Sequence, residues 1–253
     1  MEKLNLSKIL EIKNIKKHFG GIKAVNDCSF EIKEKMITAL IGPNGAGKTT
    51  VFNLISGLMR VDMGKILLNG INITNKSIED ISNLGISRLF QQSRLFNNLT
   101  VRENLLLPMD NEDTKFWKNF FGRNKITKEK ESKINEMLEF VELKEIKSKQ
   151  ARDLSYGQKR LVELIRTILN PHIFLMLDEP VAGISPQLRG VLAQFLLKLK
   201  SQGETILLIE HDMNFAFGVS NEIIVMDEGR VIAEGGPEEI KNNSRILEAY
   251  LGE

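Results

Sequence analysis

Short apolar runs recur along the chain, and each is followed by glycine, glutamine or charged residues. Residues 173–177 are apolar throughout, and residues 36–41 and 205–209 are nearly so. Runs of this kind are typical of strands that are buried on both faces of a sheet. Residues 86–90 are predicted to add another strand. The pattern therefore predicts a central sheet with its polar residues gathered where the strands end.

Segments with helical spacing separate these strands. Val51, Leu54 and Ile55 recur at helical intervals after the first run. The helices predicted between the strands cover residues 48–57, 78–84, 161–169 and 187–199. Alternating strands and helices predict an α/β fold with a mostly parallel central sheet.

The flanking segments have a different character. Residues 9–17 alternate apolar and charged positions, and residues 25–32 and 64–70 are also predicted as strands, which indicates an N-terminal antiparallel β part. Residues 222–227 and 229–233 are predicted to form a late strand pair.

Residues 97–150 are predicted to form a mostly helical insert that extends to about residue 170. Thr100 and Glu103 have the spacing of a capping box. Within the insert, residues 116–121 gather aromatic side chains among lysines. This cluster predicts either a patch facing a membrane or a partner, or ordinary packing inside a small subdomain.

A glycine-rich segment lies between the predicted strand 36–41 and the predicted helix 48–57. It fits the phosphate-loop pattern of Gly, four residues, Gly-Lys and then Ser or Thr. The candidate nucleotide-binding residues are Gly42, Pro43, Asn44, Gly45, Ala46, Gly47, Lys48, Thr49 and Thr50. An ordinary glycine-rich turn is the alternative, but it does not explain the strand and helix on either side.

The residue types in this loop suit phosphate chemistry. Glycines let a phosphate approach the backbone N–H groups, and the N-terminus of the following helix faces the same anion. Lys48 adds a positive charge for the outer phosphates, and the Thr49 hydroxyl suits Mg²⁺, which prefers oxygen ligands. A dinucleotide-binding fold is a poor alternative because the Gly-x-Gly-x-x-Gly spacing is absent. The sequence therefore predicts a phosphate-loop NTPase.

Polar residues follow the other predicted strands. Asp178 and Glu179 come after residues 173–177, Gln91 after residues 86–90, and His211 close behind residues 205–209. In a phosphate-loop protein, an Asp here is expected near Mg²⁺ and a neighbouring Glu is expected to activate water. Taken singly, helix capping, a structural glutamine and a surface histidine are the alternatives.

Two further features are candidate nucleotide contacts. Ser155, Gly157 and Gln158 precede a predicted helix, where serine and glycine make an anion site, although a simple N-cap also explains Ser155. Phe19 lies in the turn after the first predicted strand and is either an adenine-stacking ring or an ordinary core or turn aromatic.

Composition excludes several classes of protein. The 253-residue chain has a formal net charge of +2, which lacks the basic excess of a general nucleic-acid binder. Its single cysteine, Cys28, allows no internal disulfide and fits a reducing compartment. No apolar run reaches the roughly 18 residues needed to span a bilayer, and the N-terminal residues do not have the pattern of a signal peptide. Work at a membrane would require a partner.

Together these motifs resemble the ATP-binding subunits of ABC transporters. The phosphate loop, Gln91, Leu-Ser-x-Gly-Gln at residues 154–158, residues 177–180 and residues 210–212 occur in that family's order. The resemblance covers essentially the whole chain and implies one cassette. It assigns residues 1–96 and 151–253 to the ATP-binding core, and residues 97–150, extending to about 170, to a helical subdomain.

Finer features resemble the ATP-binding subunit of branched-chain amino acid importers. They are residues 19–25, residues 94–96 after Gln91, Tyr156 at the variable position of the Leu-Ser-x-Gly-Gln signature, residues 209–213 and residues 249–253. One departure is Ser185, where the family often has Asp or Asn. It leaves open how the two ATP sites communicate.

The resemblance implies a role for each candidate around ATP and Mg²⁺. Lys48 and the loop amides hold the β- and γ-phosphates, and Thr49 binds Mg²⁺. Gln91 contacts Mg²⁺ and the attacking water, and Asp178 supports the metal. Glu179 is implied as the general base.

The remaining implied contacts surround the same nucleotides. His211 holds the γ-phosphate, and Phe19 stacks on adenine. Ser155, Gly157 and Gln158 reach the nucleotide bound to the opposite subunit, so that two subunits enclose two ATP molecules head to tail.

These roles predict an ATPase that powers solute import through separate membrane permeases. The expected partners are the permeases, a second ATP-binding subunit that is identical or related, and indirectly a solute-binding protein; no nucleic acid is expected. The expected location is the cytoplasmic face of the inner membrane. The alternatives are a lipid or lipopolysaccharide exporter, a soluble ABC-type ATPase acting on DNA or ribosomes, and a nucleotide-binding regulator without turnover.

Overall fold

A computed structural model describes residues 7–90, 95–109 and 128–243 of the chain. Gln91, Arg94, the aromatic cluster at 116–121 and the C-terminal residues 244–253 lie outside the described residues. Among the described residues, no helix has the length and apolarity that crossing a membrane requires.

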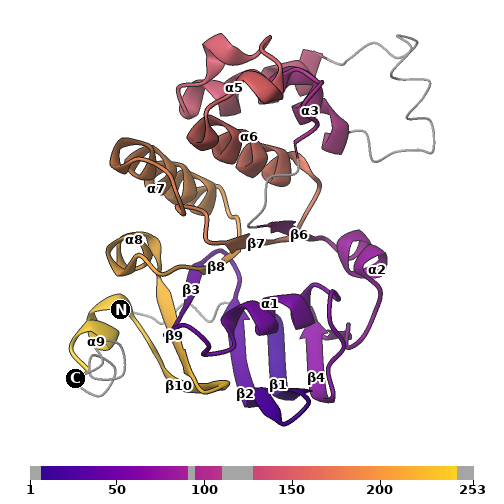
Figure 1. Cartoon of the computed structure of the whole chain (residues 1–253), viewed down its shortest axis with the longest axis vertical. Coiled ribbons are helices and arrows are strands. Elements are labelled where there is room, and N and C mark those ends of the chain that lie inside the picture. The colour runs from indigo at the N-terminus through magenta and orange to yellow at the C-terminus, as the bar shows by residue number, and fades with distance from the viewer. Residues whose placement is uncertain (1–6, 91–94, 110–127, 244–253) are drawn as a thin grey trace.

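A six-stranded sheet forms the centre of the molecule (Figure 1), in the order β10-β9-β3-β8-β7-β6. The pairs from β9 through β3, β8 and β7 to β6 are parallel, and β10 joins β9 antiparallel. The strands are β3 (Ile37–Ile41), β6 (Ile86–Leu89), β7 (Phe174–Asp178), β8 (Ile206–Ile209), β9 (Glu222–Asp227) and β10 (Arg230–Gly235). This confirms the predicted mostly parallel sheet.

A second, four-stranded sheet is built from the N-terminal part of the chain, in the order β2-β1-β4-β5. Every pairing in it is antiparallel. Its strands are β1 (Lys8–Phe19), β2 (Ile22–Lys33), β4 (Met63–Leu68) and β5 (Ile71–Asn72). The antiparallel part predicted from the alternation is confirmed; the two-residue β5 was not predicted because it is too short to show a period.

Helices cover the sheets, and those from the middle of the chain gather in one layer. In Figure 1, α3, α5 and α6 lie together on the far side of the six-stranded sheet from the antiparallel sheet. The helices are α1 (Lys48–Ile55), α2 (Ile78–Asn83), α3 (Val101–Leu106), α5 (Lys128–Phe140), α6 (Tyr156–Leu169), α7 (Pro186–Ser201), α8 (Met213–Val219) and α9 (Pro237–Lys241). Short 3₁₀ turns lie at Leu107–Met109, Lys144–Ile146 and Ala151–Asp153.

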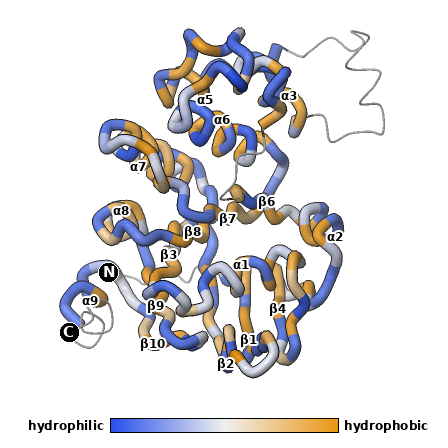
Figure 2. Tube along the Cα trace, in the orientation of Figure 1, coloured by the Kyte–Doolittle hydropathy of each residue, from blue (hydrophilic) through white to orange (hydrophobic). Residues whose placement is uncertain are grey.

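Alternate residues of the central strands are buried in two different cores. On β3, Ile37, Ala39 and Ile41 pack with the α6 and α7 layer, whereas Leu40 packs with α1 and the antiparallel sheet. Figure 2 shows β3 in the hydrophobic colour, while α5 mixes both colours as an amphipathic helix does. Burial on both faces explains the continuous apolar runs of the sequence.

Two helices differ from the sequence prediction. α6 begins at Tyr156 rather than at residue 161, because a capping box at Ser155 organises a first turn that lacks apolar periodicity. α8 was not predicted. It begins after Asp212, whose side chain accepts a hydrogen bond from the Phe215 N–H (3.0 Å), and its seven residues are too few to show a clear period.

Candidate functional site: a nucleotide site at the carboxyl edge of the sheet

The phosphate loop connects β3 to α1. Gly42 has φ +154°, and a Cβ at that position would lie 2.1 Å from the Met226 carbonyl oxygen. Gly47 has φ +96°, and its Cβ would lie 2.4 Å from the Ala24 carbonyl oxygen. Backbone from neighbouring segments therefore leaves room only for glycine at both positions.

The N-terminus of α1 is not capped by a side-chain hydrogen bond from the described residues. Its leading N–H groups and its partial positive charge suit an anion. Lys48 is buried, and its Nζ donates to the carbonyl oxygens of Gly42 (2.6 Å) and Pro43 (2.9 Å). Burial lowers the pKa of Lys48, against an opposing effect of the Glu179 charge. Phosphate oxygens can take over as acceptors for this ammonium group.

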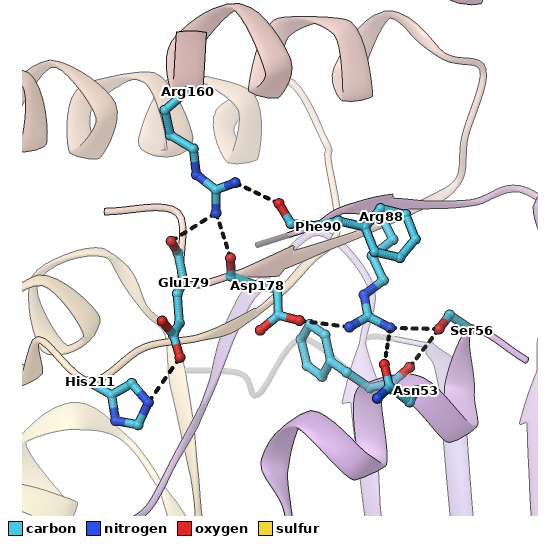
Figure 3. A network of polar contacts seen from close by, with 9 residues as sticks. Asn53, Ser56, Arg88, Phe90, Arg160, Asp178, Glu179 and His211 are labelled. Carbon is cyan, nitrogen blue, oxygen red and sulfur yellow. Dashed lines mark hydrogen bonds and ion pairs between the residues drawn. The ribbon is translucent and has the colours of Figure 1, made fainter. Parts of the chain in front are cut away.

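Asp178, at the end of β7, is paired with an arginine that the sequence analysis missed (Figure 3). Arg88 Nη2 lies 2.6 Å from Asp178 Oδ2, and both side chains are 6% exposed. Arg88 Nη1 also donates to Asn53 Oδ1 (2.8 Å) and Ser56 Oγ (2.7 Å) on α1. The arginine thus links strand β6, the acidic end of β7 and the helix that follows the phosphate loop.

Glu179 is placed against His211. Glu179 Oε1 lies 3.1 Å from His211 Nε2, and the two side chains point toward each other (Figure 3). Glu179 has a left-handed backbone, with φ +47°, which is strained for a residue with a side chain. Strained backbone of this kind clusters at functional sites.

Arg160 is a second residue that the sequence analysis missed. It lies on α6 and is 3% exposed, and its guanidinium donates to the carbonyl oxygens of Phe90 (2.6 Å), Asp178 (2.6 Å) and Glu179 (2.9 Å). Figure 3 shows it joining the end of β6 to the end of β7. An arginine within an apolar helix face was the available signal, since buried charges need partners.

The signature residues lie at the N-terminus of α6. Ser155 forms a capping box with Gln158: the Ser155 N–H donates to Gln158 Oε1 (3.0 Å), and Ser155 Oγ accepts from the Gln158 N–H (3.3 Å). A Cβ on Gly157 would lie 2.7 Å from Leu188 Cδ1 of α7. α6 packs with α3 and α5, so these residues belong to a different layer from the phosphate loop.

Phe19 lies at the end of β1 and is 45% exposed, with Lys17 Nζ 5.6 Å from its ring centroid. The ring is therefore not a core aromatic. Stacking on adenine and an ordinary aromatic at a turn both remain predictions. Gln91 directly follows Phe90, whose carbonyl Arg160 holds, but lies outside the described residues.

The donor chemistry fits Mg²⁺. Thr49 is exposed in the first turn of α1 and offers a hydroxyl, and Asp178 offers a carboxylate. Within the described part of the chain no group of three His, Cys, Asp or Glu side chains is arranged to hold a metal. An oxygen-liganded ion that shares its coordination with substrate phosphates matches this sparse set of protein ligands.

Taken together, the fold and this edge define a phosphate-loop nucleotide-binding protein. The family pattern described as ABC transporter matches residues 25–182, and that of the branched-chain amino acid ATP-binding cassette transporter matches residues 230–253. The chain belongs to the ABC transporter family, as its ATP-binding cassette component. Membership implies nucleotide binding and ATP hydrolysis.

Similar proteins include some that are named as branched-chain amino acid transport ATP-binding proteins. The chain is 39% identical to the probable branched-chain amino acid transport ATP-binding protein LivG of Archaeoglobus fulgidus, covering 97% of this chain and 96% of that one. It is 38% identical to the high-affinity branched-chain amino acid transport ATP-binding protein BraF of Pseudomonas aeruginosa, covering 97% and 98%.

Solved structures agree with the fold. A nucleotide-free ATP-binding cassette from an ABC transporter superposes with a TM-score of 0.82 at 36% identity, covering 98% of this chain and all of that one. The dimeric cassette MJ0796, in a post-hydrolysis state bound to ADP and Pi, gives a TM-score of 0.75 at 27% identity, covering 90% and 98%.

Proposed function

We propose that this chain is the ATP-hydrolysing subunit of an importer of branched-chain amino acids, working with separate membrane permeases. One observation carries the proposal: the phosphate loop, Asp178 and the Glu179–His211 pair are held at the same edge of one sheet. The solute class is supported by the names of the similar proteins and by the match over residues 230–253.

The chemistry follows from the geometry. ATP binding moves Lys48 from the carbonyl oxygens of Gly42 and Pro43 to the β- and γ-phosphates, while the residues from Gly42 to Thr50 surround them with N–H groups. Phe19 stacks on the adenine. Glu179 accepts a proton from the attacking water, and His211 donates a hydrogen bond to the γ-phosphate.

The metal site uses oxygen ligands. Thr49, Asp178 and Gln91 would hold Mg²⁺, which would supply positive charge to the phosphate oxygens when bound. Hydrolysis is therefore expected to depend on Mg²⁺. Arg88 holds Asp178 through one carboxylate oxygen, and the other points away from the arginine (Figure 3).

A second subunit completes each site. Ser155, Gly157 and Gln158 contact the nucleotide of the opposite subunit, which is either a copy of this chain or a related one; the dimeric MJ0796 cassette supports this arrangement. We propose one cassette over residues 1–253, with a helical subdomain at 97–150 extending to about 170. The cytoplasmic face of the inner membrane is the proposed location.

Purification with partners from native membranes tests the proposal. Mass spectrometry is expected to identify two many-spanning permeases, and in reconstituted vesicles a leucine-loaded binding protein is expected to stimulate ATP hydrolysis. Glu179→Gln in the same complex is the control for background hydrolysis. Recovery with a lipid-exporter membrane subunit would replace import by export, and recovery with ribosomes or DNA would contradict transport altogether.

A further inference from the structure

A buried acid next to His211 has no part in the chemistry above. Glu210 directly follows β8 and is 3% exposed. Its Oε1 accepts from the Val181 N–H (3.0 Å), and its Oε2 accepts from the His211 N–H (3.2 Å). The two N–H groups belong to different segments, one just after Glu179 and the other carrying His211.

The segment after β7 needs such support because its backbone is strained. Glu179 has φ +47°, a conformation that costs about 1–2 kcal/mol for a residue with a side chain. Its N–H donates to the Ile209 carbonyl oxygen (3.1 Å), and its own carbonyl accepts from Arg160 (2.9 Å). Two residues further on, the Val181 N–H donates to Glu210.

We infer that Glu210 is a positioning residue for hydrolysis. Its carboxylate bridges the segment after Glu179 to the segment that carries His211, and so sets the 3.1 Å contact between those two side chains. The inference rests on the proposed role of Glu179 as general base. A carboxylate fits this place because it offers acceptors to N–H groups that arrive from two directions.

The two hydrogen bonds accepted by Glu210 depend on pH, because its surroundings shift its pKa. Burial raises the pKa of Glu210 to about 7, against the opposing effect of backbone N–H groups of Val181, Asp212 and His211, with a further rise from the Glu179 charge. Glu179 is the charged group that acts on Glu210 from the segment after β7. The neighbouring ionisable groups have partners of their own: the His211 ring contacts Glu179, Asp212 pairs with Arg189 of α7 at 2.6 Å, and Arg160 of α6 donates to the Glu179 carbonyl oxygen. Above pH 7 the ionised carboxylate accepts from both segments. Below pH 7 protonation turns one oxygen into a donor and weakens the bridge.

Glu210→Gln in the full-length chain tests the inference, because glutamine keeps the shape but replaces one acceptor oxygen with a donor. Turnover is expected to fall roughly 10- to 100-fold, the size of effect expected for lost hydrogen bonds to a charged group. Affinity for a fluorescent ATP analogue is expected to stay within about twofold, since the phosphate loop is untouched. Wild-type kcat is expected to rise between pH 6 and 8 as Glu210 ionises, and this rise is expected to disappear in the variant.

Glu222→Gln is the matched control, since Glu222 is a partly buried acid on β9 that pairs with Lys33. It is expected to keep both turnover and the pH profile. Glu210→Asp is the second variant, in case the glutamine variant does not fold: the shorter acid keeps its charge but cannot reach both N–H groups, so turnover is again expected to fall.

Three outcomes overturn the inference. One is wild-type turnover and pH profile in Glu210→Gln. Another is wild-type turnover in Glu210→Asp. The third is an equal loss of nucleotide affinity and turnover, which would indicate general disruption. Glu179→Gln measured alongside separates the two proposals: normal hydrolysis by that variant would remove the general-base assignment itself, whereas an inactive Glu179→Gln beside a fully active Glu210→Gln would remove only the positioning role.

Discussion

The N-termini of α1 and α6 were both predicted as anion sites, but they differ in whether a side chain caps them. α1 begins after Gly47 without a side-chain cap from the described residues, whereas α6 begins with a complete capping box between Ser155 and Gln158. The uncapped end can bind phosphate with N–H groups for which no side chain in the described part of the chain competes. At the N-terminus of α6 the Gln158 N–H already donates to Ser155 Oγ, so fewer N–H groups are left for an anion. This end can still offer the Ser155 hydroxyl and the Gly157 backbone to a nucleotide, but on its own it is the weaker anion site.

This difference suggests that the two ends act in sequence. We expect the end of α1 to bind nucleotide within one chain, and the end of α6 to contribute only when a second subunit brings it to that nucleotide. The following predictions test this division, from the largest expected effect to the smallest.

Glu179→Gln separates chemistry from binding at the α1 site. Turnover is expected to fall about 10²–10⁴-fold because the general base is lost, while both helix ends remain intact. Steady-state phosphate release measures turnover, and light scattering with ATP measures subunit association, which is expected to persist. Near-normal phosphate release would contradict the assignment of the base.

Lys48→Ala removes the positive charge that the uncapped end of α1 relies on. Nucleotide affinity is expected to fall roughly 10- to 100-fold, because charge-assisted hydrogen bonds to phosphate are lost. Titration with a fluorescent ATP analogue measures the change, with Lys159→Ala, at a partly buried lysine in the first turn of α6, as the control for losing a lysine at a helix start. Equal affinities of the two variants for the ATP analogue would contradict the proposal that the single chain binds nucleotide at the α1 end and not at the α6 end.

Ser155→Ala removes the cap from α6. The free energy of unfolding without nucleotide is expected to fall by about 1 kcal/mol, because an N–H at the helix start loses its acceptor. Binding of the ATP analogue by the single chain is expected to be unchanged, while turnover by the dimer falls. A loss of nucleotide binding by the single chain would contradict the proposal that Ser155 contacts the nucleotide of the opposite subunit.

The far end of α6 offers a pH test of smaller size. Burial lowers the pKa of His172, but the contact with Glu204 (3.0 Å) and the hydrogen bond with the Asn170 carbonyl outweigh it, so the pKa is raised overall. A histidine with a raised pKa in the folded state contributes stability that is complete below its unfolded value of about 6.5 and is lost as pH rises through the folded value. His172→Gln is therefore expected to destabilise by up to about 1 kcal/mol at pH 5.5 and by less at pH 9. Urea unfolding at both pH values measures this, and a difference that grows with pH would contradict it.

Much of the fold could be predicted because local sequence carried it. The apolar strands, the glycine pattern of the phosphate loop and the box at Thr100 are each readable within a few residues, and the structure places them as expected. α8 and the early start of α6 were missed because both depend on single caps, at Asp212 and Ser155, rather than on a period.

The polar network at the site could not be predicted in the same way. Arg88 and Asp178 are ninety positions apart, and Arg160 reaches carbonyl groups at the ends of two strands. Whether such residues come into contact depends on how the strands and helices are arranged in the folded chain. No spacing along the sequence gives that arrangement.

The sequence by itself therefore determined the class of protein and named the candidate residues for phosphate contact, because glycine, lysine and carboxylate at these positions have few other uses. Only the tertiary structure decided how those residues are held. Glu179 is strained, and Arg160, Glu210 and the Ile209 carbonyl fix its surroundings. The physical reason is that buried charges and strained backbone need partners, and those partners come from strands and helices that meet only in the folded chain.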